Sequence, residues 1–180
     1  MKPLGFGWPN IISVVRILFV PVLVALILMD GRTMQQVAAG LFLVLAATDA
    51  LDGYLARRHA MTTETGKWLD PLSDKLLVIA PMLVLSWQAI FPWWATAVII
   101  LREAAVSGLR IYVGNRRMSM PASQMGKLKT IAQIVAIALF IFPGVNSGLQ
   151  LGVLLIAIAF TLYSGAEYFL GARALMESQR

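Results

Sequence analysis

Six apolar stretches, each about 20 residues long and so close to the length of a bilayer-crossing helix, occupy most of this 180-residue chain. Hydrophobic residues make up 59% of the sequence and charged residues only 13%, whereas a soluble domain usually has about 25% charged residues. We expect transmembrane helices at Ile11–Met29, Met34–Arg57, Trp68–Trp87, Trp93–Val113, Leu128–Pro143 and Leu149–Leu170. The sequence therefore predicts an all-α, polytopic membrane protein, with six helices in one bundle and a single domain over residues 1–180.

The basic residues predict how the bundle is oriented. They surround the start of the chain, the second and fourth links and the C-terminus, whereas the other links hold only Arg32. Because cytoplasmic loops carry an excess of Lys and Arg, both termini are expected in the cytoplasm, with Arg16 counted among the cytoplasmic charges. Trp87, Trp93 and Trp94 cluster at the opposite end, where indole rings favour the membrane interface.

Four of the nine acidic residues lie in or at the edge of apolar stretches: Asp49, Asp52, Asp70 and Asp74. A carboxylate inside a span costs about 2.5–3.5 kcal/mol on the translocon scale. An ion pair or a polar helix contact would explain one such residue, but four in one short window need another explanation. Asp49 and Asp52 are three residues apart and Asp70 and Asp74 four apart, so each pair shares one helix face.

These carboxylates would repel one another if nothing lay between them, because their helices are expected to be antiparallel neighbours. Oxygen ligands suit Mg²⁺ or Mn²⁺, and the chain has no cysteine and a single histidine, His59, in a link. Two ions about 3.5–4 Å apart would balance the charge and serve phosphoryl chemistry. The sequence thus predicts a site for two divalent cations.

Small and basic residues around the aspartates are suited to a phosphorylated ligand. Gly53 and Ala56 leave space on the face that carries Asp49, and Arg57 can pair with a phosphate. Gly66 permits close approach of the backbone to a bound group. Ordinary helix packing would explain either glycine alone.

The spacing of these residues resembles the signature of the CDP-alcohol phosphotransferase family. The chain matches all eight fixed positions of that signature between residues 49 and 74. The resemblance implies a six-helix membrane enzyme, usually a homodimer, whose site opens to the cytoplasm and the lipid. It also implies that the four aspartates bind two metal ions and that Asp74 is the general base. The cytidine diphosphate group would be bound by Asp49, Asp52, Gly53, Ala56, Arg57, Gly66 and Asp70.

Outside the signature, much of residues 9–135 resembles the bacterial phosphatidylglycerophosphate synthase branch of the family. The similar segments are Pro9–Arg16, Arg102-Glu103, Ser107–Arg110 and Gly126–Gln133. This resemblance implies phospholipid biosynthesis in a bacterial inner membrane, with CDP-diacylglycerol as donor and glycerol 3-phosphate as acceptor. No nucleic-acid partner is expected. The last apolar stretch, Leu149–Leu170, carries no recognisable functional motif.

Four basic residues in the fourth and fifth stretches are candidates to bind the acceptor's phosphate: Arg102, Arg110, Lys127 and Lys129. For the two lysines, the positive-inside rule or attraction to anionic lipid is an alternative explanation. Arg102 lies well inside an apolar stretch, where a charge needs a reason, and Glu103 is its candidate partner or a supporting group.

Two alternatives remain open from the sequence. A family member could use another acceptor alcohol, such as inositol phosphate or phosphatidylglycerol, because a phosphate clamp does not identify what carries the phosphate. A divalent cation transporter would also place carboxylates in spans. The crowding of the acids at one end of the helices and the full signature oppose this second alternative.

Overall fold

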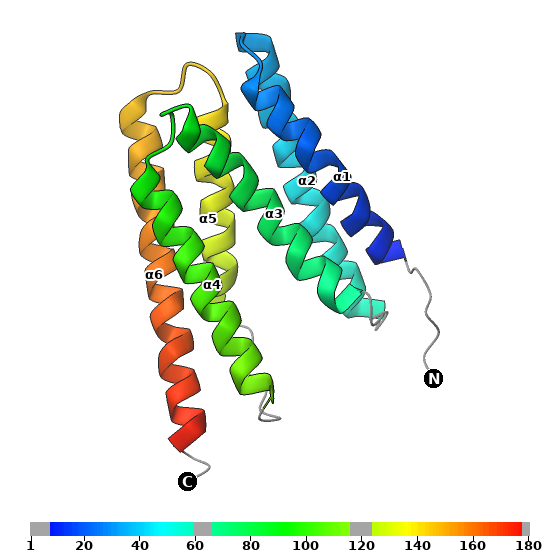
Figure 1. Cartoon of the computed structure of the whole chain (residues 1–180), viewed down its shortest axis with the longest axis vertical. Helices are drawn as coiled ribbons and strands as arrows, with labels where there is room; N and C mark the ends of the chain where they lie inside the picture. Colours follow the sequence, from blue (N-terminus) through cyan, green and yellow to red (C-terminus); the bar gives the residue numbers. More distant parts are fainter. Residues whose placement is uncertain (1–7, 60–65, 116–123, 178–180) are drawn as a thin grey trace. The chain divides into compact units, whose positions relative to one another are not determined.

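The computed structural model of the chain describes residues 8–59, 66–115 and 124–177, and it describes side chains within 12–48, 72–114 and 124–177. These residues form helices and no strands. The helices are α1 (Trp8–Leu28), α2 (Arg32–His59), α3 (Gly66–Trp87), α4 (Trp93–Asn115), α5 (Gln124–Ile141) and α6 (Ser147–Glu177) (Figure 1). The all-α prediction is confirmed for the described residues, and a helix lies at each of the six predicted stretches. That all six helices cross a membrane stays a prediction.

The largest boundary difference is at the end of α6, which continues past the predicted Leu170 to Glu177. Span prediction counts apolar residues and stops where they thin out, whereas the residues that follow are mostly good helix formers. Arg173 Nε also donates a hydrogen bond to Glu177 Oε1 at 2.8 Å, an i,i+4 pair that supports the last turn.

Local signals at the links explain where the helices begin and end. Gly31, between α1 and α2, has φ 118°, a conformation that side chains disfavour. At the start of α6, Asn146 Oδ1 accepts hydrogen bonds from the backbone N–H groups of Gly148 at 2.8 Å and Leu149 at 3.3 Å. Asn146 is therefore a helix N-cap.

The chain divides into two compact units. The first comprises residues 1–90 with 137–145, and the second comprises residues 91–136 with 146–180. A single domain over the whole chain stays a prediction.

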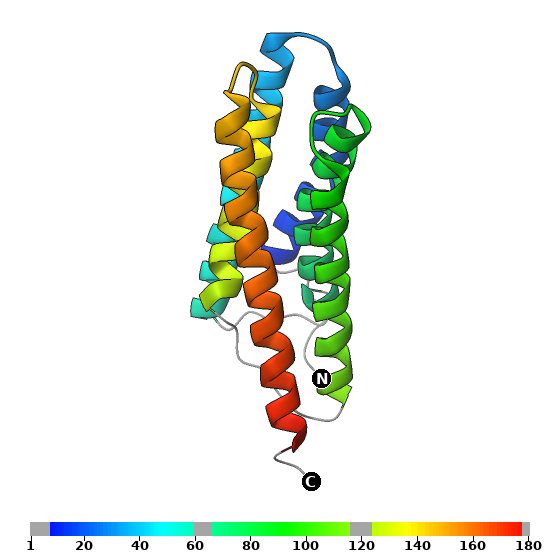
Figure 2. The ribbon, with the colours of Figure 1, turned by 90° about the vertical axis from the view of Figure 1, so that its left-hand side faces the viewer.

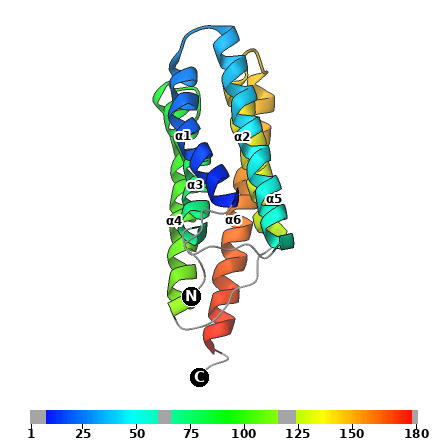
Figure 3. The ribbon, with the colours of Figure 1, turned by 90° about the vertical axis from the view of Figure 1, so that its right-hand side faces the viewer.

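In the first unit, α1 packs against both α2 and α3 (Figure 3). Its core includes the fully buried side chains of Leu23, Phe42 and Leu85, one from each helix. Gln88 Nε2 donates to the carbonyl oxygen of Ile27 at 3.2 Å. This bond satisfies one of the carbonyls that the end of α1 leaves without a helical partner.

In the second unit, α4 and α6 pack side by side (Figure 2). The buried face of α6 combines small and polar residues such as Thr161, Ser164 and Gly165 with apolar ones such as Leu154. Leucines are also exposed on this helix, and small and polar helix contacts with apolar side chains outside are typical of membrane bundles. Within the part of the chain that the structure describes, α5 and α6 are long and apolar enough to cross a membrane.

The end of α3 places a non-glycine residue in a left-handed conformation. Ala89 has φ 57°. Its N–H bonds to the Ser86 carbonyl at 3.1 Å, and the N–H of Ile90 bonds to the Leu85 carbonyl at 2.9 Å. These two bonds form a Schellman motif, in which the left-handed position is usually glycine because a Cβ atom is disfavoured there.

We therefore predict that Ala89→Gly stabilises the protein. Relief of the left-handed strain should raise the free energy of unfolding by about 1 kcal/mol. The measurement is chemical unfolding in detergent. Ala105→Gly, at an exposed interior position of α4, is the control and should lower stability by about 1 kcal/mol. Equal losses in both variants would contradict the role assigned to Ala89.

Candidate active site

A buried arginine of α1 holds the predicted general base of α3. The Arg16 side chain is only 2% exposed, and its Nη1 donates to Ser73 Oγ at 2.7 Å and to Asp74 Oδ1 at 3.2 Å. The Asp74 side chain is 51% exposed. The carboxylate is thus held by a buried cation while about half of its surface stays accessible, which suits a group that must meet a substrate.

This arrangement gives Arg16 a role that the sequence did not predict. The residue was counted only among the cytoplasmic charges, which stays a prediction, and the structure buries its side chain against α3. The physical reason is its acidic partner: an arginine inside an apolar stretch is tolerated when a carboxylate accepts its hydrogen bonds. Its position well inside the first apolar stretch was the signal that could have identified this role.

The other predicted donor-site residues are placed only by their helices. Asp49, Asp52, Gly53, Ala56 and Arg57 lie in α2, and Gly66 and Asp70 lie in α3, with Gly66 as its first residue. Helical backbone at these positions supports the expectation that each aspartate pair shares a face. Their side chains lie outside the described residues, so the four-aspartate metal site stays a prediction.

The donor set nevertheless fits the predicted cations chemically. All four positions are aspartates, which offer oxygen ligands, the preference of Mg²⁺ and Mn²⁺. Among the residues whose side chains are described, no three His, Cys, Asp or Glu residues gather into another metal-binding group. A thiolate site is excluded because the chain has no cysteine.

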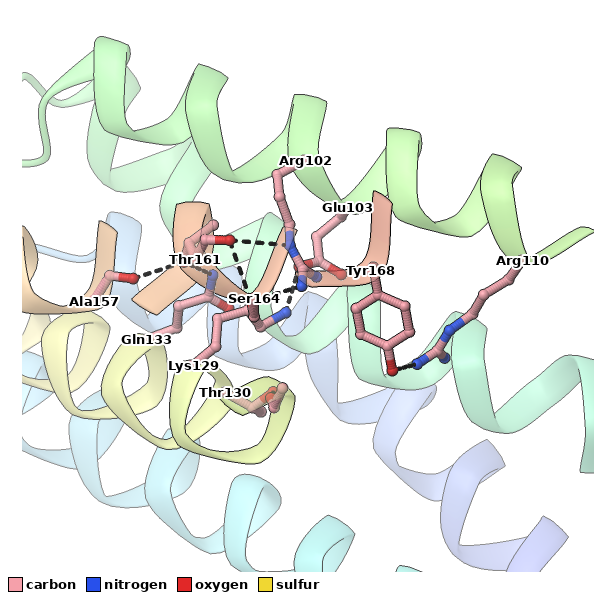
Figure 4. A network of polar contacts seen from close by, with 11 residues as sticks. Arg102, Glu103, Arg110, Lys129, Thr130, Gln133, Ala157, Thr161, Ser164 and Tyr168 are labelled. Atoms are coloured by element: carbon pink, nitrogen blue, oxygen red, sulfur yellow. Dashed lines mark hydrogen bonds and ion pairs between the residues drawn. The ribbon is translucent and has the colours of Figure 1, made fainter. Parts of the chain in front are cut away.

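In the second unit, Glu103 joins two of the four predicted phosphate-binding cations (Figure 4). Its Oε1 accepts a hydrogen bond from Arg102 Nη1 at 3.0 Å and another from Lys129 Nζ. These contacts confirm Glu103 as the partner of Arg102 and show that it also holds Lys129 of α5. The three charges sum to one positive charge, so the carboxylate offsets part of the field that the cations would otherwise offer an anion.

Helix α6 completes this network, which the sequence reading missed. Arg102 Nε donates to the Thr161 carbonyl at 3.3 Å and Nη2 donates to Ser164 Oγ at 2.7 Å. From α5, Gln133 Nε2 donates to Thr161 Oγ1 at 2.9 Å. A signal was present: Thr161, Ser164, Gly165 and Tyr168 recur at helical spacing as a polar or small stripe along an otherwise apolar helix.

Arg110 has a different environment. Its Nη2 donates to the Tyr168 hydroxyl, and its guanidinium lies over the Tyr168 ring at 4.8 Å from the centroid (Figure 4). Arg110 itself is exposed, as is Lys127. The predicted acceptor cations thus fall into two kinds: Arg102 and Lys129 are paired with Glu103, whereas Arg110 and Lys127 are exposed. The contacts of these residues with a phosphate stay a prediction.

Comparisons with known proteins agree with these observations. A family model described as CDP-alcohol phosphatidyltransferase matches residues 6–163. The chain is 38% identical to a Mycobacterium tuberculosis (strain H37Rv) protein named "Probable phosphatidylglycerophosphate synthase", over 93% of this chain and 81% of the relative. Two proteins named "CDP-diacylglycerol--glycerol-3-phosphate 3-phosphatidyltransferase" are also similar. That of Bacillus subtilis (strain 168) is 36% identical over 91% of this chain and 94% of its own length. That of Escherichia coli (strain K12) is 34% identical over 94% and 96%.

The Glu103 network predicts a large difference between two glutamates of this chain. Glu103 is 19% exposed and accepts from two cations, whereas Glu177 is 62% exposed and pairs only with Arg173 among the described residues. Glu103→Gln should lower the free energy of unfolding by about 1.5–3 kcal/mol, because a charged acceptor is lost and two cations are left facing each other. Glu177→Gln should change it by less than about 0.5 kcal/mol. Unfolding of both variants in detergent is the measurement, and equal effects would contradict the network's role.

Proposed function

The chain belongs to the CDP-alcohol phosphatidyltransferase family, and on that premise we propose that it transfers the phosphatidyl group of CDP-diacylglycerol to glycerol 3-phosphate. The products are phosphatidylglycerophosphate and CMP, in phospholipid biosynthesis. The observation that carries the proposal is the similarity to the Bacillus subtilis and Escherichia coli proteins named for this reaction, which covers 91% and 94% of this chain. The family resemblance predicted from the aspartate signature is thereby confirmed.

We place the protein in a bacterial inner membrane, with six spans, both termini in the cytoplasm and a site open to the cytoplasm. The apolar helices α5 and α6 and their exposed leucines support a lipid environment. The exposed indole rings of Trp87, Trp93 and Trp94, at the end of α3 and the start of α4, suit a membrane interface. A homodimer is part of the proposal on the family resemblance alone.

On the donor side, the cytidine diphosphate group is bound by the small and charged residues of α2 and the start of α3. Arg57 offers a charge-assisted contact to phosphate, and Gly53, Ala56 and Gly66 leave room for the head group. Asp49, Asp52, Asp70 and Asp74 would hold two Mg²⁺ or Mn²⁺ ions, which offset negative charge on the diphosphate when bound.

The chemical step needs a base and a leaving group. Asp74 takes the proton from the 1-hydroxyl of glycerol 3-phosphate. The hydroxyl oxygen then forms a bond to the phosphorus that carries diacylglycerol, and the bond from that phosphorus to the bridging oxygen breaks, so that CMP leaves. Arg16 supports this role because its hydrogen bond holds Asp74 Oδ1 in place.

On the acceptor side, the phosphate dianion is bound by basic residues of α4 and α5. Arg110 and Lys127 are exposed and form the direct contacts in this proposal. Arg102 and Lys129 keep their place as predicted phosphate residues, but each already donates to Glu103. They would therefore contact the phosphate only through their remaining N–H groups.

The first test of this function is an acceptor panel. Purified protein is given CDP-diacylglycerol with glycerol 3-phosphate, inositol phosphate, phosphatidylglycerol or glycerol, and the lipid product is identified by mass spectrometry. We expect product from glycerol 3-phosphate and little from glycerol, which lacks the phosphate. Lipid product from another alcohol and not from glycerol 3-phosphate would identify that alcohol as the acceptor. Metal uptake into proteoliposomes without lipid turnover would instead favour a divalent cation transporter.

Chelation tests the metal part of the proposal. Since the predicted ligands are all carboxylates, EDTA should abolish CMP release, and Mg²⁺ or Mn²⁺ should restore it. An undiminished rate of CMP release in EDTA would contradict a role for divalent cations in the reaction. Adding Mg²⁺ and Mn²⁺ back in separate experiments also compares the rates that the two cations support.

A further prediction separates the aspartates. Asp74→Asn should abolish turnover, because an amide is a far poorer base, while its oxygen still accepts the bond from Arg16 and the protein stays folded. Metal-dependent binding of CDP, measured by calorimetry, should persist in this variant. Asp52→Asn should instead weaken donor or metal binding along with the rate. Substantial CMP release by Asp74→Asn would exclude that residue as the base and make Asp70 the next candidate.

A further inference from the structure

Tyr168 of α6 lies against both arginines of α4 that are predicted to bind phosphate. Its side chain is buried, at 6% exposure. Its hydroxyl accepts a hydrogen bond from Arg110 Nη2, and its ring lies 4.8 Å from the Arg110 guanidinium and 6.0 Å from that of Arg102 (Figure 4). One aromatic ring thus supports two cations through its negative face.

The Tyr168 side chain is enclosed by the protein, since only 6% of it is exposed. Gly126 of α5 lies nearby, and a Cβ atom added there would reach van der Waals distance, 4.0 Å, from Tyr168 Cε2. A buried, packed aromatic ring can hold a longer, more flexible side chain in one orientation.

The two arginines differ in what remains available for a ligand. All three nitrogens of Arg102 already donate: Nε to the Thr161 carbonyl, Nη1 to Glu103 and Nη2 to Ser164. Arg110 donates only from Nη2 among the described residues. A guanidinium has five N–H donors, so Arg110 is held in place and still has donors for an incoming anion.

An exposed arginine without such support would lose much rotamer freedom on binding a ligand, and affinity would fall accordingly. We propose that Tyr168 is a positioning residue for the acceptor: it orients Arg110 through the hydrogen bond and the ring contact, so that the guanidinium is preorganised for the phosphate of glycerol 3-phosphate. This inference rests on the proposed function and extends it to α6, which the aspartate signature does not reach.

The test is the steady-state kinetics of Tyr168→Phe. Loss of the hydroxyl should raise KM for glycerol 3-phosphate roughly fivefold, because Arg110 then loses more rotamer freedom on binding the phosphate while the ring contact stays. Tyr168→Leu, which removes the ring as well, should raise it further. KM for CDP-diacylglycerol and kcat should stay near the wild-type values. Tyr163→Phe is the matched control, since Tyr163 lies on the same helix but is 60% exposed, and it should change nothing.

A structural role is separated from a positioning role by combining variants. If Tyr168 acts through Arg110, Tyr168→Phe should have little further effect on KM in an Arg110→Ala background. The conservative Arg110→Lys variant, which keeps the charge but loses the planar fork, should likewise show little response to Tyr168→Phe. Equal, additive effects in the wild-type and Arg110→Ala backgrounds would overturn the inference.

Three further outcomes are decisive. Normal formation of phosphatidylglycerophosphate with an unchanged acceptor KM in Tyr168→Phe would overturn the inference and leave the proposed function standing. No phosphatidylglycerophosphate from the wild-type protein would overturn both. A fall in kcat with unaltered acceptor KM would also overturn it, because that pattern indicates a general loss of structure.

Discussion

A charged side chain in an apolar helix requires a partner, and this requirement organises the polar interior of both units. The cost of an unpaired charge in a membrane-like environment is at least a few kcal/mol. In the first unit, buried Arg16 of α1 is paired with Asp74 of α3. In the second unit, Arg102 and Lys129 share Glu103, and Arg110 is held by Tyr168. Most of these contacts join two different helices. They therefore lower the free-energy cost of each buried charge and also hold its side chain in one position.

The paired charged residues differ in whether they remain available to a ligand or substrate. Arg102 donates from all three nitrogens to Glu103 and to α6, so its main role is to connect α4 with α6. Arg110 is supported from one side and keeps donors for a ligand. Asp74 is held by Arg16 yet remains half exposed. A charge that is both held and accessible is preorganised, and preorganisation lowers the cost of binding and of chemistry.

Different parts of this account were accessible from the sequence to different degrees. The six helices followed from apolar stretches of membrane-spanning length, and the family followed from the aspartate signature in α2 and α3. The end of α6 was placed too early because helix propensity, unlike hydropathy, continues through Arg173. The contact between Arg16 and Asp74 was not predicted because Asp74 lies 58 residues away in the chain, a distance that local patterns do not span.

The polar stripe of α6 shows the same limit. Thr161, Ser164 and Tyr168 look like isolated polar residues in an apolar stretch, and only the packing of α4 against α6 shows that they receive the donors of Arg102 and Arg110. Glu103 was identified from the sequence because its partner is the preceding residue. Its second partner, Lys129 of α5, required the fold.

The proposed reaction requires that the acceptor's hydroxyl oxygen attack the phosphorus that carries diacylglycerol. The most direct measurement uses glycerol 3-phosphate labelled with heavy oxygen in its 1-hydroxyl and follows the label by mass spectrometry of the lipid and nucleotide products. Attack at this phosphorus should give labelled phosphatidylglycerophosphate and unlabelled CMP. Label in a cytidine-containing product, or lipid product without label, would contradict it.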